Sequence, residues 1–137
     1  MQSNVQTAPV PKKRLWAGRI ISALSVLFLL FDSIGKLLKL APVLEGTTRL
    51  GYPESVILGI GIVELVCLVV YVIPRTSILG AVLLTGYLGG AVATHVRIGS
   101  PLFTHILFPV YIGVLVWGGL FLRDDPLRAL IPLRKGE

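Results

Sequence analysis

Cysteine and charge are both scarce in this chain. A single cysteine, Cys67, excludes a disulfide framework, a Cys-x-x-Cys redox pair and a structural zinc site built from cysteines. Charged residues make up 15% of the chain, against about 25% in soluble globular domains. The low hydrophobicity that disorder requires is also missing, because 54% of the residues are hydrophobic and the mean hydropathy is +0.83. What remains is a small membrane protein, and 137 residues leave room for one domain.

Four apolar segments are each long enough to cross a bilayer as a helix, which needs roughly 20 residues. They cover about residues 20–38, 55–73, 76–96 and 102–122. The connections after the second and third segments are so short that neighbouring helices must run antiparallel. We therefore predict an all-α, polytopic membrane protein that forms an antiparallel up-down four-helix transmembrane bundle.

The rest of the chain divides around these segments. We expect a flexible basic tail at residues 1–14, the transmembrane domain at 15–125 and a basic tail at 126–137. The longer connection at 39–54 has room for a short interfacial helix. A cleavable signal peptide is the competing interpretation of the first segment, but Asp32 and Lys36 beside the candidate cleavage site argue against it.

The basic residues predict orientation and partner. With both termini inside, nine lysines and arginines lie on the inner side and four on the outer side, which the positive-inside rule favours. The net charge of +6 arises from residues that flank apolar segments. That placement suits anionic lipid, so we expect a lipid bilayer as the partner and no nucleic acid.

Ionisable side chains within the segments need a partner or a wet cavity, because they are expensive in lipid. With this orientation they fall between the midplane and the outer surface, and every segment contributes. We predict that they line one polar pocket, with these members: Asp32, Lys36, Glu64, Tyr87, His95, Arg97 and His105.

Simpler interpretations stay open for several of these residues. Asp32 and Lys36 are spaced i, i+4, so they can form a neutralising pair on one helix face. Glu64 fits either a structural hydrogen bond or a proton or ligand site. The two histidines also suit an interface with lipid headgroups. Their spacing is poor for a metal site, so we expect no metal ligands.

Small residues mark the third segment. Gly86, Gly90 and Thr94 recur at four-residue spacing, a pattern that lets two helices pack closely. In the fourth segment Pro109 is expected to kink the helix. Cys67, among aliphatic neighbours, is expected to be inert.

Several stretches together resemble the DoxX-like family of small bacterial membrane proteins. The most specific is residues 86–97 (GYLGGAVATHVR), followed by Gly99, Pro101 and residues 117–124 (WGGLFLRD). The stretches 31–36 (FDSIGK) and 61–65 (GIVEL) add to the likeness, which extends from about Arg19 to Pro132.

The resemblance implies a four-helix bundle in the bacterial cytoplasmic (inner) membrane. It also implies relatives in membrane redox systems, including a small subunit of an archaeal thiosulfate:quinone oxidoreductase. The polar positions that match the family pattern are Asp32, Lys36, Glu64, His95 and Arg97. Direct sulfur transfer is not implied here, since Cys67 is the only thiol.

We hypothesise a small subunit or accessory protein of a membrane redox complex, with a polar pocket for a quinone or another lipid-like ligand. As an isolated chain we do not expect it to be an enzyme. The alternative is a non-catalytic interaction or assembly protein that binds a membrane protein partner or a second copy of itself. A small transporter is less favoured, because the chain shows no inverted repeat.

Overall fold

A computed structural model describes residues 11–130 of the chain, which form helices joined by short connections. The predicted tails lie largely outside this range. The elements in order are α1 (Lys12–Leu37), α2 (Ala41–Arg49), α3 (Glu54–Val72), η1 (Pro74–Thr76), α4 (Ser77–Arg97), η2 (Leu102–Ile106), α5 (Phe108–Arg123) and α6 (Asp125–Leu130).

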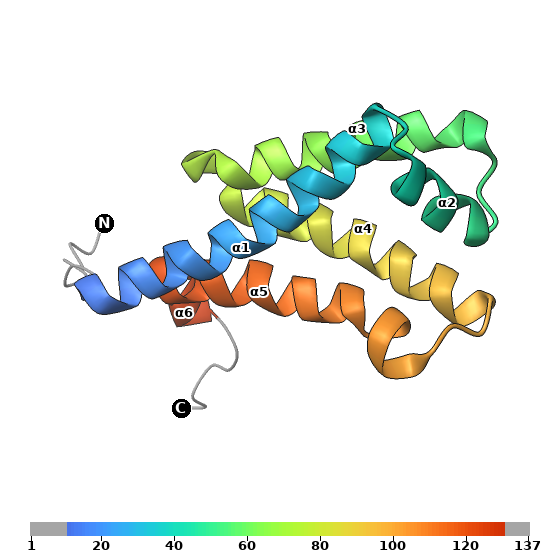
Figure 1. The fold of residues 1–137 in the computed structure, drawn as a ribbon. Helices are drawn as coiled ribbons and strands as arrows, with labels where there is room; N and C mark the ends of the chain where they lie inside the picture. The colour runs from blue at the N-terminus through green and yellow to red at the C-terminus, as the bar shows by residue number, and fades with distance from the viewer. Residues whose placement is uncertain (1–10, 131–137) are drawn as a thin grey trace.

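The long helices form the predicted bundle (Figure 1). Helix α1 packs against α3 and α5, and α4 also packs against α3 and α5, so the four helices surround a common core. Four stretches are long and apolar enough to cross a membrane: Lys12–Leu37, Glu54–Val72, Pro74–Arg97 and Leu102–Arg123. The prediction of an antiparallel four-helix membrane bundle is confirmed.

Two helix boundaries differ from the expected ones. Helix α1 begins at Lys12, directly after Pro11, and so extends well before the apolar run that starts at Ile20. The start of the helix is held in place because Arg14 donates to the carbonyl of Leu122 and pairs with Asp125. Hydropathy alone marks the apolar part of a helix, so this polar first turn was missed.

The fourth span is interrupted rather than simply kinked. Residues 102–106 form a single wide π-type turn, and α5 starts afresh at Phe108 with Pro109 in its first turn. A proline is tolerated there because the first helical turn has no internal partner for its N–H groups. Pro109 therefore acts as a helix start.

One end of the bundle is packed very closely. A Cβ atom at Gly80 of α4 would lie 2.2 Å from the backbone nitrogen of Tyr71 on α3, and one at Gly18 of α1 would lie 2.7 Å from the carbonyl oxygen of Gly119 on α5. Only glycine permits these approaches. The Tyr71 hydroxyl lies 2.8 Å from the Ser22 hydroxyl and donates to the carbonyl of Val116 at 2.8 Å. We call this region the closed end.

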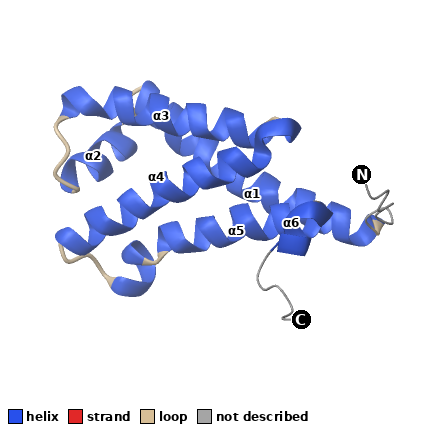
Figure 2. Ribbon diagram, turned by 180° about the vertical axis from the view of Figure 1, so that it is seen from behind, coloured by secondary structure: helices blue, strands red, loops and turns tan. Residues whose placement is uncertain are grey.

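The helices diverge toward the opposite end, where α2 packs against α1 and α3 (Figures 1 and 2). The connection 39–54 thus carries the short helix for which the sequence has room. Large apolar side chains cover the outer surface of the long helices; Phe31 is 68% exposed and Val114 64%. Such a surface belongs in lipid, which agrees with a multi-pass membrane protein.

Candidate functional site

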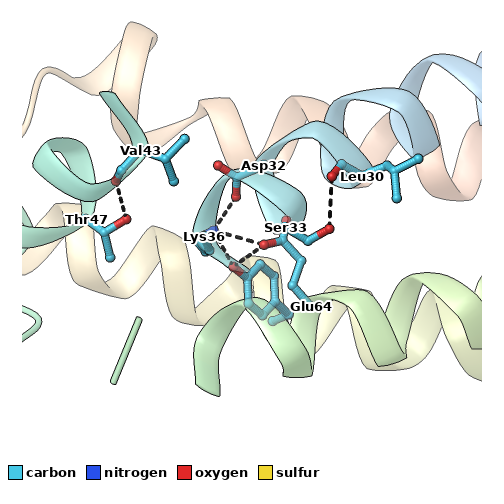
Figure 3. Close-up of polar contacts among 8 residues, drawn as sticks. Leu30, Asp32, Ser33, Lys36, Val43, Thr47 and Glu64 are labelled. Carbon is cyan, nitrogen blue, oxygen red and sulfur yellow. Dashed lines mark hydrogen bonds and ion pairs between the residues drawn. The ribbon is translucent and has the colours of Figure 1, made fainter. Parts of the chain in front are cut away.

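A charged cluster joins three helices inside the bundle. Lys36 of α1 donates to Glu64 of α3 at 2.9 Å and to the hydroxyl of Tyr87 of α4 at 3.0 Å. It also pairs with Asp32, one turn earlier on α1. Tyr87 in turn donates to the same Glu64 oxygen at 3.0 Å. Figure 3 shows Asp32, Lys36 and Glu64 directed toward one another.

A glycine brings the cluster together. A Cβ atom at Gly61 of α3 would lie 2.8 Å from the Cβ of Lys36 and 3.3 Å from the Ser33 carbonyl oxygen. Because Gly61 has no side chain, α1 and α3 approach closely at this level. Glu64 lies one turn further along α3, within reach of the ammonium group.

Glu64 is fully buried, at 0% exposure, and lies about 15 Å from the start of α3, near the middle of the span. Its oxygen Oε2 receives both hydrogen bonds, whereas Oε1 has no partner among the described residues. Buried polar atoms are nearly always hydrogen-bonded, because leaving one unpaired costs about 1–3 kcal/mol. Oε1 therefore has room for one further hydrogen bond, from a bound water molecule or from a ligand.

A large cleft begins at this cluster and extends toward the end that carries α2. Its volume is about 1270 Å³, compared with roughly 300–1,000 Å³ for typical ligand pockets. The walls are mostly apolar, and α1, α2, α3, α4, η2 and α5 all contribute. Polar and charged residues are grouped at two levels, with Asp32, Lys36, Glu64 and Tyr87 at one level and Arg49, His95 and His105 among those nearer the loops.

The structure brings together most of the residues predicted for one pocket. Asp32, Lys36, Glu64 and Tyr87 form the cluster, and both histidines line the same cleft. The rings of His95 and His105 meet edge to face, with centroids 5.7 Å apart. Their Nδ1 atoms pair locally, with Ser100 at 3.0 Å and Thr104 at 2.8 Å.

Arg97 is placed differently from the prediction. It does not line the cleft in the described part of the chain, and instead donates to the carbonyl of Leu50 at 2.7 Å. The guanidinium also lies against Gly51, whose φ of +94° suits glycine. Arg97 therefore links the α2–α3 connection to the end of α4 by a hydrogen bond.

The predicted packing role of Gly86, Gly90 and Thr94 needs correction. A Cβ atom at Gly86 or Gly90 would meet nothing within 4 Å, so no helix of the described chain packs on them. All three residues line the cleft instead. The small side chains leave space in the cleft, while the close helix contacts occur at Gly18, Gly61, Gly80 and Gly119.

Sequence reasoning missed the contribution of α2 and the loop that follows it. Thr47, Arg49 and Tyr52 all line the cleft, and the Tyr52 hydroxyl lies 2.9 Å from the Thr94 hydroxyl of α4. The sequence does indicate a polar helix of nine residues between two membrane spans. It does not show whether that helix packs against the cleft or away from it.

Four membrane-length helices and a buried charged cluster that opens into a cleft define a small multi-pass membrane protein with a polar site inside its bundle. The chain belongs to the DoxX-like family, whose model matches residues 20–119. This match confirms the resemblance seen in the sequence. Neither the curated proteins nor the solved structures include a match to the chain.

Proposed function

We propose that the chain binds a quinone or another lipid-like ligand in the cleft, as a small subunit or accessory protein of a membrane redox complex. The observation that carries the proposal is the shape and chemistry of the cleft: apolar walls that end on a buried charged cluster with one unpaired carboxylate oxygen. The redox context comes from the DoxX-like family resemblance. As an isolated chain the protein binds and positions the ligand.

The two parts of the cleft suit the two parts of such a ligand. Apolar residues on facing helices, among them Phe28, Val63 and Ile112, would contact a ring or an isoprenoid tail. The cluster would hydrogen-bond the polar substituents. Hydrogen bonds and charges act more strongly at a site removed from water, so a few such contacts fix the orientation of the ligand.

The first experiment is to purify the intact protein in mild detergent and analyse an organic extract by mass spectrometry. The expected result is a quinone or another defined lipid at close to one molecule per chain. An extract that contains only bulk phospholipid, at the level found with an unrelated membrane protein, contradicts the proposal.

Two neighbouring glycines of α4 provide a matched pair of variants. Both Gly89 and Gly90 have open space at the Cβ position, but only Gly90 lines the cleft. We expect Gly90→Leu to fill part of the cleft and reduce the bound ligand at least severalfold, with the bundle intact because leucine favours helix over glycine. Gly89→Leu is expected to retain the ligand. Equal ligand content in the two variants would mean that the ligand binds outside the cleft.

The alternative, a non-catalytic assembly protein, makes a different prediction. A partner helix, or a second copy of the chain, would then contact the exposed apolar faces, and site-directed crosslinks from α4 would capture it in the membrane. We further propose that the protein resides in the bacterial cytoplasmic membrane with both termini inside. The basic residues near the closed end, including Arg14, Arg19 and Arg123, support this orientation.

A further inference from the structure

The hydrogen-bond donors of the charged cluster are all used within the cluster itself. A lysine ammonium group has three N–H bonds, and Lys36 directs them to Asp32, Glu64 and Tyr87. The single O–H of Tyr87 is directed to Glu64. With both carboxyl groups ionised, these four residues therefore have no donor left for a ligand.

Acceptor atoms, by contrast, remain. Oxygen Oε1 of the fully buried Glu64 has no partner among the described residues. Asp32 is bonded to Lys36 through Oδ2, and nothing in residues 11–130 donates to its other oxygen. The Asp32 side chain is 33% exposed and lines the cleft, so a ligand can reach it directly.

Among the described residues that line the cleft, the other side-chain donors lie nearer the loops, and they include Arg49, His95 and His105. The cleft thus presents acceptors at the cluster and donors toward the loops. A quinone carbonyl only accepts hydrogen bonds, so it is matched at the loop level and mismatched at the cluster. A hydroquinone hydroxyl both donates and accepts, so it is matched at both.

We infer that the ligand brings hydrogen-bond donors to Asp32 and Glu64, so that the cleft binds a hydroquinone in preference to the corresponding quinone. The inference rests on the proposed function, because it names the form of the ligand that the proposed cleft holds. It concerns binding alone and does not depend on which protein supplies or uses the electrons.

The test compares three probes on the intact wild-type protein in lipid nanodiscs under anaerobic conditions: a decyl-substituted benzoquinone, its hydroquinone, and the dimethyl ether of that hydroquinone. Empty nanodiscs correct for partition into lipid. We expect the hydroquinone to bind at least tenfold more tightly than the other two probes. This ratio of affinities corresponds to one hydrogen bond to a charged group. The ether keeps the ring and tail and carries methyl groups in place of the hydroxyl hydrogens.

The outcomes separate two kinds of failure. Saturable binding in which the quinone is as tight as the hydroquinone, or tighter, overturns the inference and leaves the proposed ligand cleft standing, since Glu64 would then itself donate a proton to the carbonyl. Binding of all three probes no greater than in empty nanodiscs overturns the proposed function and this inference together.

A variant makes the test more specific. In Glu64→Gln the amide must keep its oxygen toward Lys36 and Tyr87, which both donate, so its NH₂ group takes the place of Oε1. The position changes from acceptor to donor. We expect the tenfold preference to disappear or to reverse toward the quinone, whereas Glu54→Gln on the exposed start of the same helix keeps it. A preference unchanged in Glu64→Gln overturns the assignment of Glu64.

Discussion

Replacing Lys36 by methionine is the most informative test of how the bundle stabilises its buried charges. Lys36 is 7% exposed and holds two carboxylates, of which Glu64 is completely buried. Removing one partner of a buried ion pair usually costs about 3–5 kcal/mol, because the remaining charge is left uncompensated. The cost is the desolvation of that charge, rather than the net value of the pair.

The structure places the expected value near the lower end of this range. Glu64 keeps the hydrogen bond from Tyr87 at 3.0 Å, and Asp32 is exposed enough to be hydrated from the cleft. We therefore expect Lys36→Met to lower the free energy of unfolding by about 3 kcal/mol. The double variant Lys36→Met, Glu64→Gln removes the buried charge as well, and is expected to return to within about 1 kcal/mol of Glu64→Gln alone.

The assay is reversible unfolding in mixed micelles of mild detergent and increasing dodecyl sulfate, followed by helical circular dichroism. Lys13→Met is a matched control, because Lys13 is an exposed residue of the same helix; its effect should stay within about 0.5 kcal/mol. The reasoning is refuted if Lys36→Met unfolds like the wild-type protein, or if the double variant is no more stable than the single one.

Two further predictions concern packing and topology. Gly80→Ala is expected to destabilise the bundle by about 1–3 kcal/mol, because its Cβ would lie 2.2 Å from the Tyr71 nitrogen. Gly89→Ala has open space at its Cβ and should stabilise the bundle by about 0.5–1 kcal/mol. Thermal unfolding in detergent compares the two variants. With both termini inside, in a background without the native cysteine, Glu45→Cys should react with an impermeant maleimide on the outer side and Arg75→Cys only after permeabilisation. The opposite labelling pattern reverses the orientation.

The class of fold could be predicted from the sequence because hydropathy reports directly on what a helix faces. Each apolar segment of about 20 residues specifies one span, and the short connections allow only antiparallel neighbours. Helix starts were harder to predict, because Lys12 and its neighbours are polar and are held by contacts with Leu122 and Asp125, more than 100 positions away. No local pattern contains that information.

Part of the candidate site could also be predicted from the sequence. The i, i+4 spacing of Asp32 and Lys36 predicts their pairing, and depth arithmetic places Glu64 near them. Spacing along α4 could not show whether Gly86 and Gly90 face a helix or an empty space, since both need small residues on one face. That distinction depends on the angle between α4 and the other helices, which the closed end determines.

The unequal packing of the two ends has a mechanical consequence. At the closed end the helix backbones meet directly at Gly80 and at Gly18, so relative movement there is strongly restricted. Near the loops the α2–α3 connection is hydrogen-bonded to α4 through Tyr52 with Thr94 and Arg97 with Leu50, each bond worth a net of about 0.5–1.5 kcal/mol. We therefore expect the closed end to act as a pivot for movement of α4. Such a movement would widen the cleft toward the bilayer, and it predicts that backbone amides near the loops exchange their hydrogens sooner than those around Tyr71.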